Sequence, residues 1–320
     1  MTGRAKSPLP SADAVADLFT APGIAGTWMR FWFTPTSSRP LAIVRIATAL
    51  LGLLLLWSYA GDLPAWFGPA GVLPADTVAD WRGPFGWSLF DFATTPVAIH
   101  ILLAITATVF GLLLVGLLTP ITAVAAAVLW ASLLNRGPML AGPADDCLAI
   151  LLWCLAIGPA AEYFSLDRLL HDRLGMAPPR PLWRARVSLG LIQVHATAIT
   201  LGALVAQLKG DAWWNGTAAW WLAAREGSRV VDLTAIFARS EFLTNAVTHA
   251  ITGFEIAFAV GIWFTATQQT VARIGLVAWP LIGVLAGEPL WGLVMAVYAA
   301  AIGTEMKATD GFISEKSASL

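Results

Sequence analysis

The sequence predicts an all-α membrane protein, a polytopic bundle of about eight transmembrane or membrane-embedded helices. Of its 320 residues, 58% are hydrophobic and only 12% are charged, which lies outside the usual range of soluble domains. The apolar residues form long Leu, Ala, Val and Ile blocks and do not alternate with polar residues as the strands of an outer-membrane barrel do. A net charge of −1 without a concentrated basic face argues against a nucleic-acid partner.

The N-terminal segment, residues 1–37, has no uninterrupted apolar core before a small-residue cleavage site. We therefore expect a cytoplasmic arm with room for an interfacial helix, and not a signal peptide. Residues 38–305 then form the transmembrane domain, and residues 306–320 form a cytoplasmic tail.

Eight apolar blocks define the transmembrane domain. Several are shorter than the roughly 20 residues that a simple span needs, so we expect two of them to be tilted, buried or re-entrant. In chain order the blocks are Leu41–Tyr59, Pro96–Leu118, Ile121–Leu134, Leu148–Ala161, Val187–Leu208, Thr244–Phe264, Val271–Leu285 and Pro289–Ile302.

Lysine and arginine residues predict the orientation, because the cytoplasmic loops of membrane proteins carry the excess of positive charge. With eight spans and the N-terminus inside, thirteen of the 19 Lys and Arg residues fall on the cytoplasmic side, if Arg45 extends there from the first helix. Both termini are therefore predicted to be cytoplasmic. The long segments 60–95 and 209–243 then face outside, and the basic segment 160–186 forms a cytoplasmic interfacial helix and linker. The expected location is the bacterial inner membrane.

Ionisable residues in or beside the apolar blocks are candidates for function, because a charged side chain costs about 2.5–3.5 kcal/mol to insert at the bilayer centre. In the predicted topology most of them lie near the outer ends of their helices, and Glu255 lies near the membrane midplane. A cavity that opens outwards would bring them together. The candidates are His195, Lys209, His249, Glu255, Glu288, Asp145 and Asp146.

A structural role stays open for each candidate. Lys209 can extend to the interface beside a tryptophan belt, His249 can satisfy a helix contact, and the two aspartates can pair with Arg136. Glu255 is the strongest functional candidate, because a carboxylate at that depth needs a partner or a neutral state. There is no HExxH or CxxC motif, and His195 and His249 differ in depth by about 12 Å, so no metal or haem site is predicted.

Six stretches carry a resemblance to a known family: "RPLAIVRIATALLGLLLLW", "GPAGVLP", "NRGPMLAGPADD", "YFSLDRLL", "RVSLGLIQVHATAITLGALVAQLKGDAWWNGTAAWWL" and "FEIAFAVGIW". The most specific part runs from Gln193 to Ala218 and holds Gln-x-His, then Lys-Gly-x-x-Trp-x-x-Gly-Thr-Ala. In this order the stretches resemble the HTTM family, the bacterial relatives of the membrane domain of the vitamin K-dependent γ-carboxylase. The resemblance covers about residues 38–305.

The resemblance implies a carboxylase-like enzyme that uses a reduced, vitamin K-like quinone with O₂ and CO₂ in an outward-facing membrane cavity. Lys209 takes the place of the base that deprotonates the quinol, and His249 and Glu255 are the other catalytic candidates. Membrane lipid, the quinone, and a peptide or small carboxylate acceptor are the expected partners. Aromatic faces can hold a flat ring and exclude water. The residues expected around the cofactor are Arg136, Asp146, Gln193, His195, Trp213 and Trp214.

Two departures from the family pattern leave the acceptor open. The chain ends at residue 320, without the large extramembrane domain that binds the protein substrate in the animal enzyme, and Trp279 and Pro280 stand where a histidine is expected. Two other classes therefore remain as alternatives. One is a non-catalytic membrane protein that binds quinone or lipid, and the other is a small-molecule transporter, which the deep Glu255 favours.

Overall fold

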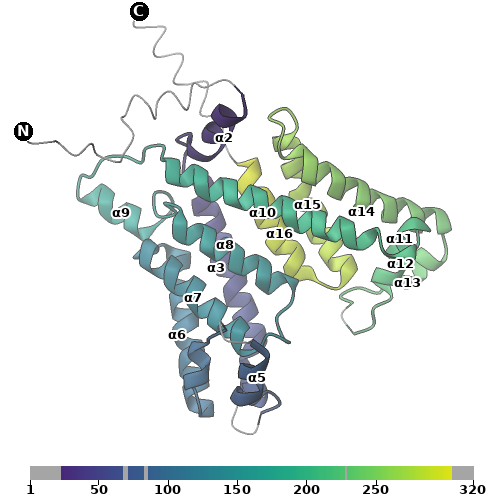
Figure 1. Cartoon of the computed structure of the whole chain (residues 1–320), viewed down its shortest axis with the longest axis horizontal. Coiled ribbons are helices and arrows are strands. Elements are labelled where there is room, and N and C mark those ends of the chain that lie inside the picture. Colours follow the sequence, from purple (N-terminus) through teal and green to yellow (C-terminus); the bar gives the residue numbers. More distant parts are fainter. Residues whose placement is uncertain (1–22, 68–70, 83–85, 228, 305–320) are drawn as a thin grey trace, which may run out of the picture.

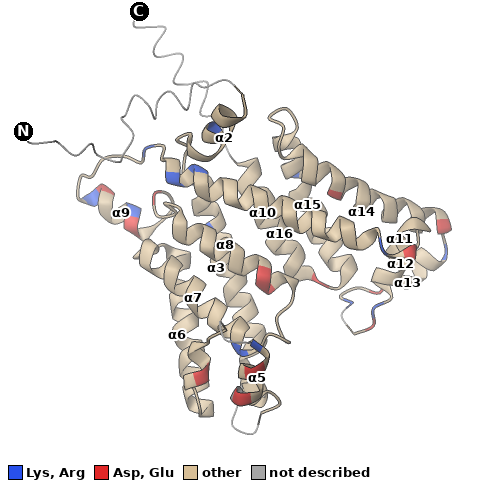
Figure 2. Ribbon diagram, viewed as in Figure 1, with Lys and Arg blue, Asp and Glu red and all other residues tan. Residues whose placement is uncertain are grey.

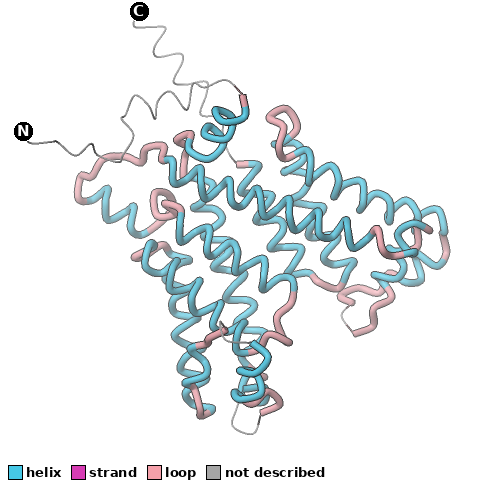
Figure 3. The backbone as a smooth tube through the Cα atoms, viewed as in Figure 1, coloured by secondary structure: helices cyan, strands magenta, loops and turns pink. Residues whose placement is uncertain are grey.

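The computed structural model describes residues 23–67, 71–82, 86–227 and 229–304. Within these ranges the chain consists of helices joined by turns and loops, with one isolated antiparallel bridge between Thr36 and Leu182 and no strand (Figure 3). The predicted all-α class is therefore confirmed. Residues 1–22 of the N-terminal arm and the predicted tail over 306–320 lie outside the described residues.

Each of the eight apolar blocks corresponds to one long helix. Among the described residues, four of these helices are long and apolar enough to cross a membrane: α3, α6, α10 and α15. The long helices are α3 (Arg39–Ala60), α6 (Pro96–Val115), α7 (Thr119–Arg136), α8 (Pro143–Ile157), α10 (Trp183–Gln207), α14 (Glu241–Gly261), α15 (Gln268–Ala286) and α16 (Pro289–Gly303).

Proline and glycine set several of the helix ends. In α6, Pro96 opens the helix, where its missing N–H costs nothing, and the Thr95 side chain accepts a hydrogen bond from the Ala98 N–H. The same helix ends at Gly116, whose φ of 71° lies in the left-handed region that glycine tolerates. Gly287, with φ 73°, likewise separates α15 from α16.

Short helices occupy the long connections. One of them, α2, belongs to the N-terminal arm and packs on α10, where Arg186 Nε donates a hydrogen bond to the Phe31 carbonyl oxygen at 2.6 Å. Another, α9, lies in the basic connection before α10, where we expected an interfacial helix. The short helices are α2 (Ile24–Phe33), α4 (Leu63–Phe67), α5 (Ala75–Arg82), the 3₁₀ helix η1 (Leu89–Phe92), α9 (Leu166–Arg173), α11 (Asp211–Trp214), α12 (Ala218–Ala223) and α13 (Thr234–Ala238).

The long helices form two groups that are joined by α10 and α16. In Figure 1, α3, α6, α7 and α8 lie on one side, α14 and α15 lie on the other, and α10 extends across both. Helix α10 contacts α8 and α14, and helix α16 contacts α3, α8, α10 and α15. Helix α16 is therefore a central helix, and its residues Val294, Met295 and Tyr298 are fully buried.

Glycines allow the close crossing of α15 and α16. A Cβ added at Gly292 would lie 2.5 Å from the Trp279 carbonyl oxygen, and one at Gly283 would lie 2.8 Å from the Gly292 Cα. Close backbone approach through small residues is a common way to pack membrane helices, where burial against lipid gives little driving force.

Arg45 differs from the sequence-based expectation. The side chain does not extend to the surface from α3 but is fully buried, and its guanidinium donates to the carbonyl oxygens of Ala160 at 2.9 Å and Phe164 at 2.5 Å. These two bonds give both terminal nitrogens of the buried guanidinium a partner and connect α3 to the segment that follows α8.

Candidate functional site

A cavity of about 340 Å³ lies between the end of α10, the short helix α11 and the middle of α14. Its volume is at the lower end of the range of about 300–1,000 Å³ that is typical of small-molecule sites. The lining is mainly apolar, with a few polar groups, as in most sites for organic ligands. The lining residues are Leu204, Gln207, Leu208, Trp213, Trp214, His249, Thr252 and Ile256.

Helical spacing explains the two long walls. His249, Thr252 and Ile256 are spaced i, i+3 and i+7, so they share one face of α14. On α10, Leu204 and Leu208 are one turn apart and lie next to Gln207 on the side that contacts α14. The cavity therefore forms where these two helix faces meet.

The aromatic wall is held in place by the turn between α11 and α12. Trp214 Nε1 donates to the Leu208 carbonyl oxygen at 3.0 Å. Thr248 on α14 donates to the Gly216 carbonyl oxygen at 2.9 Å and accepts from the Ala219 N–H at 3.0 Å. Gly216 has φ 73° and sits against Asn245, so a side chain at this position would clash. The turn over residues 216–219, which begins at the glycine of the sequence motif, thus holds the segment that carries the tryptophans against α14.

A buried polar cluster closes one end of the cavity. Gln207 Nε2 donates to Glu255 Oε2 at 2.5 Å, and Gln207 Oε1 accepts from the Thr252 hydroxyl at 2.9 Å. Gln207 is 8% exposed and Glu255 is 2% exposed. The glutamate that we expected to need a partner therefore has one, and its partner borders the cavity.

The predicted catalytic residues occupy three different surroundings. His249 lines the cavity, and Glu255 lies behind Gln207. Lys209 lies in the turn after α10, next to the lining residue Leu208, but its side chain is exposed and is not part of the lining. The predicted cofactor residues Trp213 and Trp214 both line the cavity.

Gln193 and His195 lie further back on α10 and do not border this cavity. Gln193 Nε2 donates to the Ile262 carbonyl oxygen at 2.9 Å, which joins α10 to the end of α14. His195 Nδ1 lies 2.7 Å from the Leu191 carbonyl oxygen, one turn earlier on its own helix. Both contacts are typical of polar groups that are satisfied within the bundle.

Arg136 lies in the other helix group, at the end of α7. Its guanidinium lies over the Phe67 ring, 4.7 Å from the centroid, and donates to the Phe67 carbonyl oxygen at 3.2 Å. Its Nε is 3.8 Å from Asp91 Oδ1. The structural alternative was that Arg136 pairs with the aspartates at the start of α8. Arg136 lies beside Asp91 instead.

Asp146 is exposed at the start of α8, whereas its neighbour Asp145 is buried. Asp145 accepts hydrogen bonds from the Tyr59 hydroxyl at 2.8 Å and from the Gly142 N–H at 2.8 Å. With Glu288 it borders a second cavity of about 310 Å³ between α3, α8 and the turn before α16. Asp145 and Glu288 therefore line a different cavity from the one at Gln207, whose lining, among the residues that the structure describes, contains no acidic residue.

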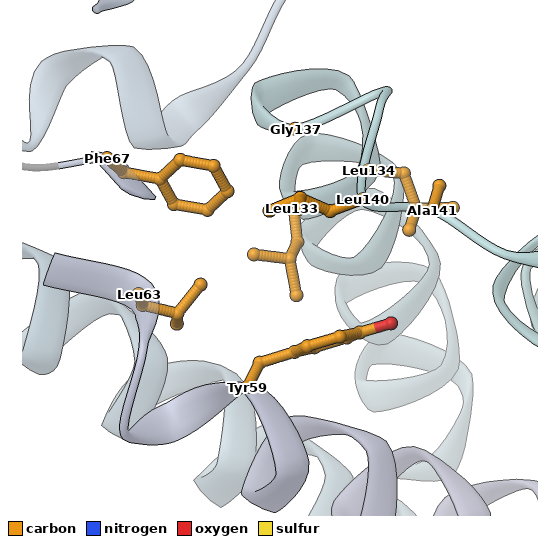
Figure 4. A pocket seen from close by; sticks show the side chains of 8 residues that line it. All are labelled: Tyr59, Leu63, Phe67, Leu133, Leu134, Gly137, Leu140 and Ala141. Atoms are coloured by element: carbon orange, nitrogen blue, oxygen red, sulfur yellow. The ribbon is translucent and has the colours of Figure 1, made fainter. Parts of the chain in front are cut away.

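A third, smaller pocket lies beside Tyr59 (Figure 4). Phe67, Leu63 and Leu133 surround it, and its volume of about 20 Å³ has room for little more than one water molecule. It is too small for an organic cofactor. Its main interest is that the Tyr59 ring forms one wall while the hydroxyl reaches Asp145.

Gln207 and Thr252 are the site residues that the sequence-based analysis missed. Little in the sequence indicates either residue. Gln207 is a polar residue at the end of an apolar helix, and Thr252 is a threonine three positions before Glu255. Trp279, where a histidine was expected, is fully buried and packs edge-to-face on Phe254 and Phe258. Within the described residues no group of three or more His, Cys, Asp or Glu side chains is placed to hold a metal ion.

Comparison of the chain with protein-family models, with curated proteins and with solved structures found no match in any of the three.

Proposed function

We propose that the chain is a membrane enzyme resembling the vitamin K-dependent γ-carboxylase, and that it binds a reduced quinone in the cavity between α10 and α14. The single observation that carries this proposal is the cavity itself: tryptophans on one wall, mainly aliphatic side chains with His249 and Thr252 on the others, and the buried Gln207 amide at one end. This combination suits a flat ring that is largely apolar and has an oxygen at its edge.

The position of the cavity favours a ligand that arrives through the lipid. Leu208, Trp214 and Ile256 line it and are also exposed on the outer surface of the molecule. Helix α10 is long and apolar enough to cross a membrane. An apolar, exposed rim on such a helix gives an isoprenoid quinone a path from the bilayer into the cavity without crossing water.

In the proposed chemistry, Lys209 removes a proton from the quinol hydroxyl. Lys209 follows Leu208 at the rim, and its long side chain can turn towards the cavity or towards water. The proton that it accepts can then pass to solvent. His249, on the opposite wall, is a second candidate for proton transfer because its ring borders the same space.

A non-catalytic quinone- or lipid-binding protein is the second candidate function. The observation that favours it is the outward position of the Lys209 side chain, which is absent from the lining of the cavity. A protein that only binds the ring would need the walls and Gln207 but no base. The transporter hypothesis is weaker, because Glu255, which favoured it, is bonded to Gln207 and is itself outside the lining.

The proposed membrane topology has eight spans, cytoplasmic termini and the long loops outside, in the bacterial inner membrane. Figure 2 supports it, because Lys and Arg residues lie on α2, α9 and the first turns of α10, at one end of the molecule. Positive charge of this kind is retained in the cytoplasm. The α11–α13 segment and the cavity would then lie towards the opposite, outer side.

Mass spectrometry of lipids that co-purify in mild detergent tests the proposed function. A quinone at about one per chain would support binding, and quinol-dependent O₂ consumption by the same sample in proteoliposomes would support catalysis. Bound quinone without O₂ consumption would favour the non-catalytic function. Purified protein without any quinone, which also fails to take up added quinol, would contradict both.

A further inference from the structure

The Gln207 side chain has one hydrogen-bond donor to spare at the edge of the cavity. An amide side chain offers one oxygen acceptor and two N–H donors. The oxygen accepts from Thr252, and one N–H donates to Glu255. The second N–H has no partner in the part of the chain that the structure describes, although the residue is 92% buried from solvent and lines the cavity.

Glu255 and Thr252 fix the orientation of this amide. The amide nitrogen faces a carboxyl oxygen of Glu255, and the amide oxygen accepts from the Thr252 hydroxyl. A flip of the amide would place its oxygen against Glu255 and its nitrogen against Thr252, so both hydrogen bonds would be lost. Because Thr252 and Glu255 are three residues apart on α14, they present their side chains to Gln207 together.

We infer that Gln207 donates this second N–H to an acceptor oxygen on the edge of the bound ring, and that Glu255 and Thr252 are positioning residues for it. The ligand class that fits is an aromatic or quinonoid ring with a carbonyl or phenolate oxygen. A pure hydrocarbon would leave the N–H unpaired in an apolar space, which is unfavourable. The inference rests on the proposed function, because it assigns the recognition of the ring in the same cavity.

Two ligands of nearly the same shape test this assignment. 2-Methyl-1,4-naphthoquinone carries two ring oxygens, and 2-methylnaphthalene carries none. Equilibrium binding of each to the full chain in lipid nanodiscs, corrected with empty nanodiscs, gives the preference for the oxygenated ring. We expect wild type to prefer the quinone and Gln207→Leu to lose about three- to tenfold in quinone affinity, with hydrocarbon affinity unchanged.

A matched set of threonine variants separates positioning from folding. Thr252→Val removes the hydroxyl that orients Gln207, so it should lower the quinone preference, whereas Thr252→Ser should restore it. Thr200→Val makes the same chemical change on α10, where the hydroxyl donates only to the Ala196 carbonyl oxygen, outside the cavity lining. It should keep the wild-type preference. Melting temperatures of all variants report folding independently of ligand.

The outcomes distinguish the inference from the proposed function. If wild type binds both rings equally, or if Gln207→Leu keeps the wild-type preference, Gln207 does not recognise the oxygen and the inference is overturned, while ring binding in the cavity stands. If wild type binds neither ring, the proposed function fails and the inference fails with it. Loss of preference in Gln207→Leu and Thr252→Val, but not in Thr252→Ser or Thr200→Val, supports both.

Discussion

Gln207 and Lys209 are two residues apart at the end of α10, yet their surroundings differ. The Gln207 amide is buried and held by two partners on α14, whereas the Lys209 side chain is exposed. A group that recognises a ligand benefits from being fixed beforehand, because less conformational entropy is lost on binding. A base must also exchange its proton with water in every cycle. The end of α10 therefore carries a fixed amide, at Gln207, close to a solvated amine, at Lys209.

Lys209→Arg separates a base from a membrane anchor. Arginine extends to the interface as well as lysine does, but its pKa above about 12 leaves no neutral form that can accept a proton. If Lys209 is the base, both Lys209→Arg and Lys209→Ala should lower quinol-dependent O₂ consumption in proteoliposomes by about 10²–10⁴-fold. Melting temperatures should stay near that of wild type, because the side chain is exposed. Turnover of Lys209→Arg at the wild-type rate would leave Lys209 as an anchor.

Glu255→Gln and Glu255→Ala should differ in stability. The glutamine oxygen can still accept from Gln207 Nε2 and keeps the side-chain volume, whereas alanine leaves a buried donor unpaired and opens a cavity. We expect Glu255→Ala to lower the free energy of unfolding by about 2 kcal/mol more than Glu255→Gln does, seen as a lower melting temperature in detergent. Equal melting temperatures for the two variants would mean that the bond to Gln207 contributes little.

At the scale of elements, the sequence was a good guide to where helices form and a poor guide to how they face one another. Each apolar block became one helix, because proline, threonine and glycine at the block ends leave few alternatives. The bond between Gln207 and Glu255 depends on the register of α10 against α14, which hydropathy does not encode. The tryptophans were found as aromatic residues beside Lys209, and His249 was found as an ionisable residue in an apolar block. Gln207 lies in the same motif but is uncharged, and it was missed because its partner is 48 residues away.

Gly292→Ala tests the close crossing of α15 and α16. The new Cβ would meet the Trp279 carbonyl oxygen at 2.5 Å, and backbone cannot move aside as a flexible side chain can. We expect a loss of about 1–3 kcal/mol in the free energy of unfolding, measured as reduced thermal stability in detergent. Gly111→Ala in α6 is the matched control, because nothing lies within 4 Å of its added Cβ, and it should be neutral or slightly stabilising. A harmless Gly292→Ala would show that the two helices are not in close contact.

At the scale of the whole molecule, helix length and burial leave two ways of crossing the membrane. α8 and α16 have 15 residues each and span only about 22 Å by helical rise, less than the roughly 30 Å hydrocarbon core. Other helices cover much of α8 and α16, so these two helices do not need the length or the apolar surface of a helix that faces lipid. Eight helices can therefore cross, with short ones in the centre, or only the four long apolar ones can. The distribution of Lys and Arg does not distinguish the two topologies. With the N-terminus inside, both place α9 on the cytoplasmic side and α13 on the outer side.

Cysteine labelling at four exposed positions decides between them. With the N-terminus inside, both topologies place Met176 inside and Glu226 outside, so Met176→Cys should resist an impermeant thiol reagent in intact cells and Glu226→Cys should react. Met139, between α7 and α8, is outside with eight spans and inside with four, and Phe264, between α14 and α15, behaves in the opposite way. We expect Met139→Cys to react and Phe264→Cys to be protected. The native Cys147 and Cys154 are buried, so wild type should give little background. Protection of Met139→Cys together with reaction of Phe264→Cys would establish four spans. Reaction of Met176→Cys would mean that the orientation is the reverse of the predicted one and that the cavity lies on the cytoplasmic side.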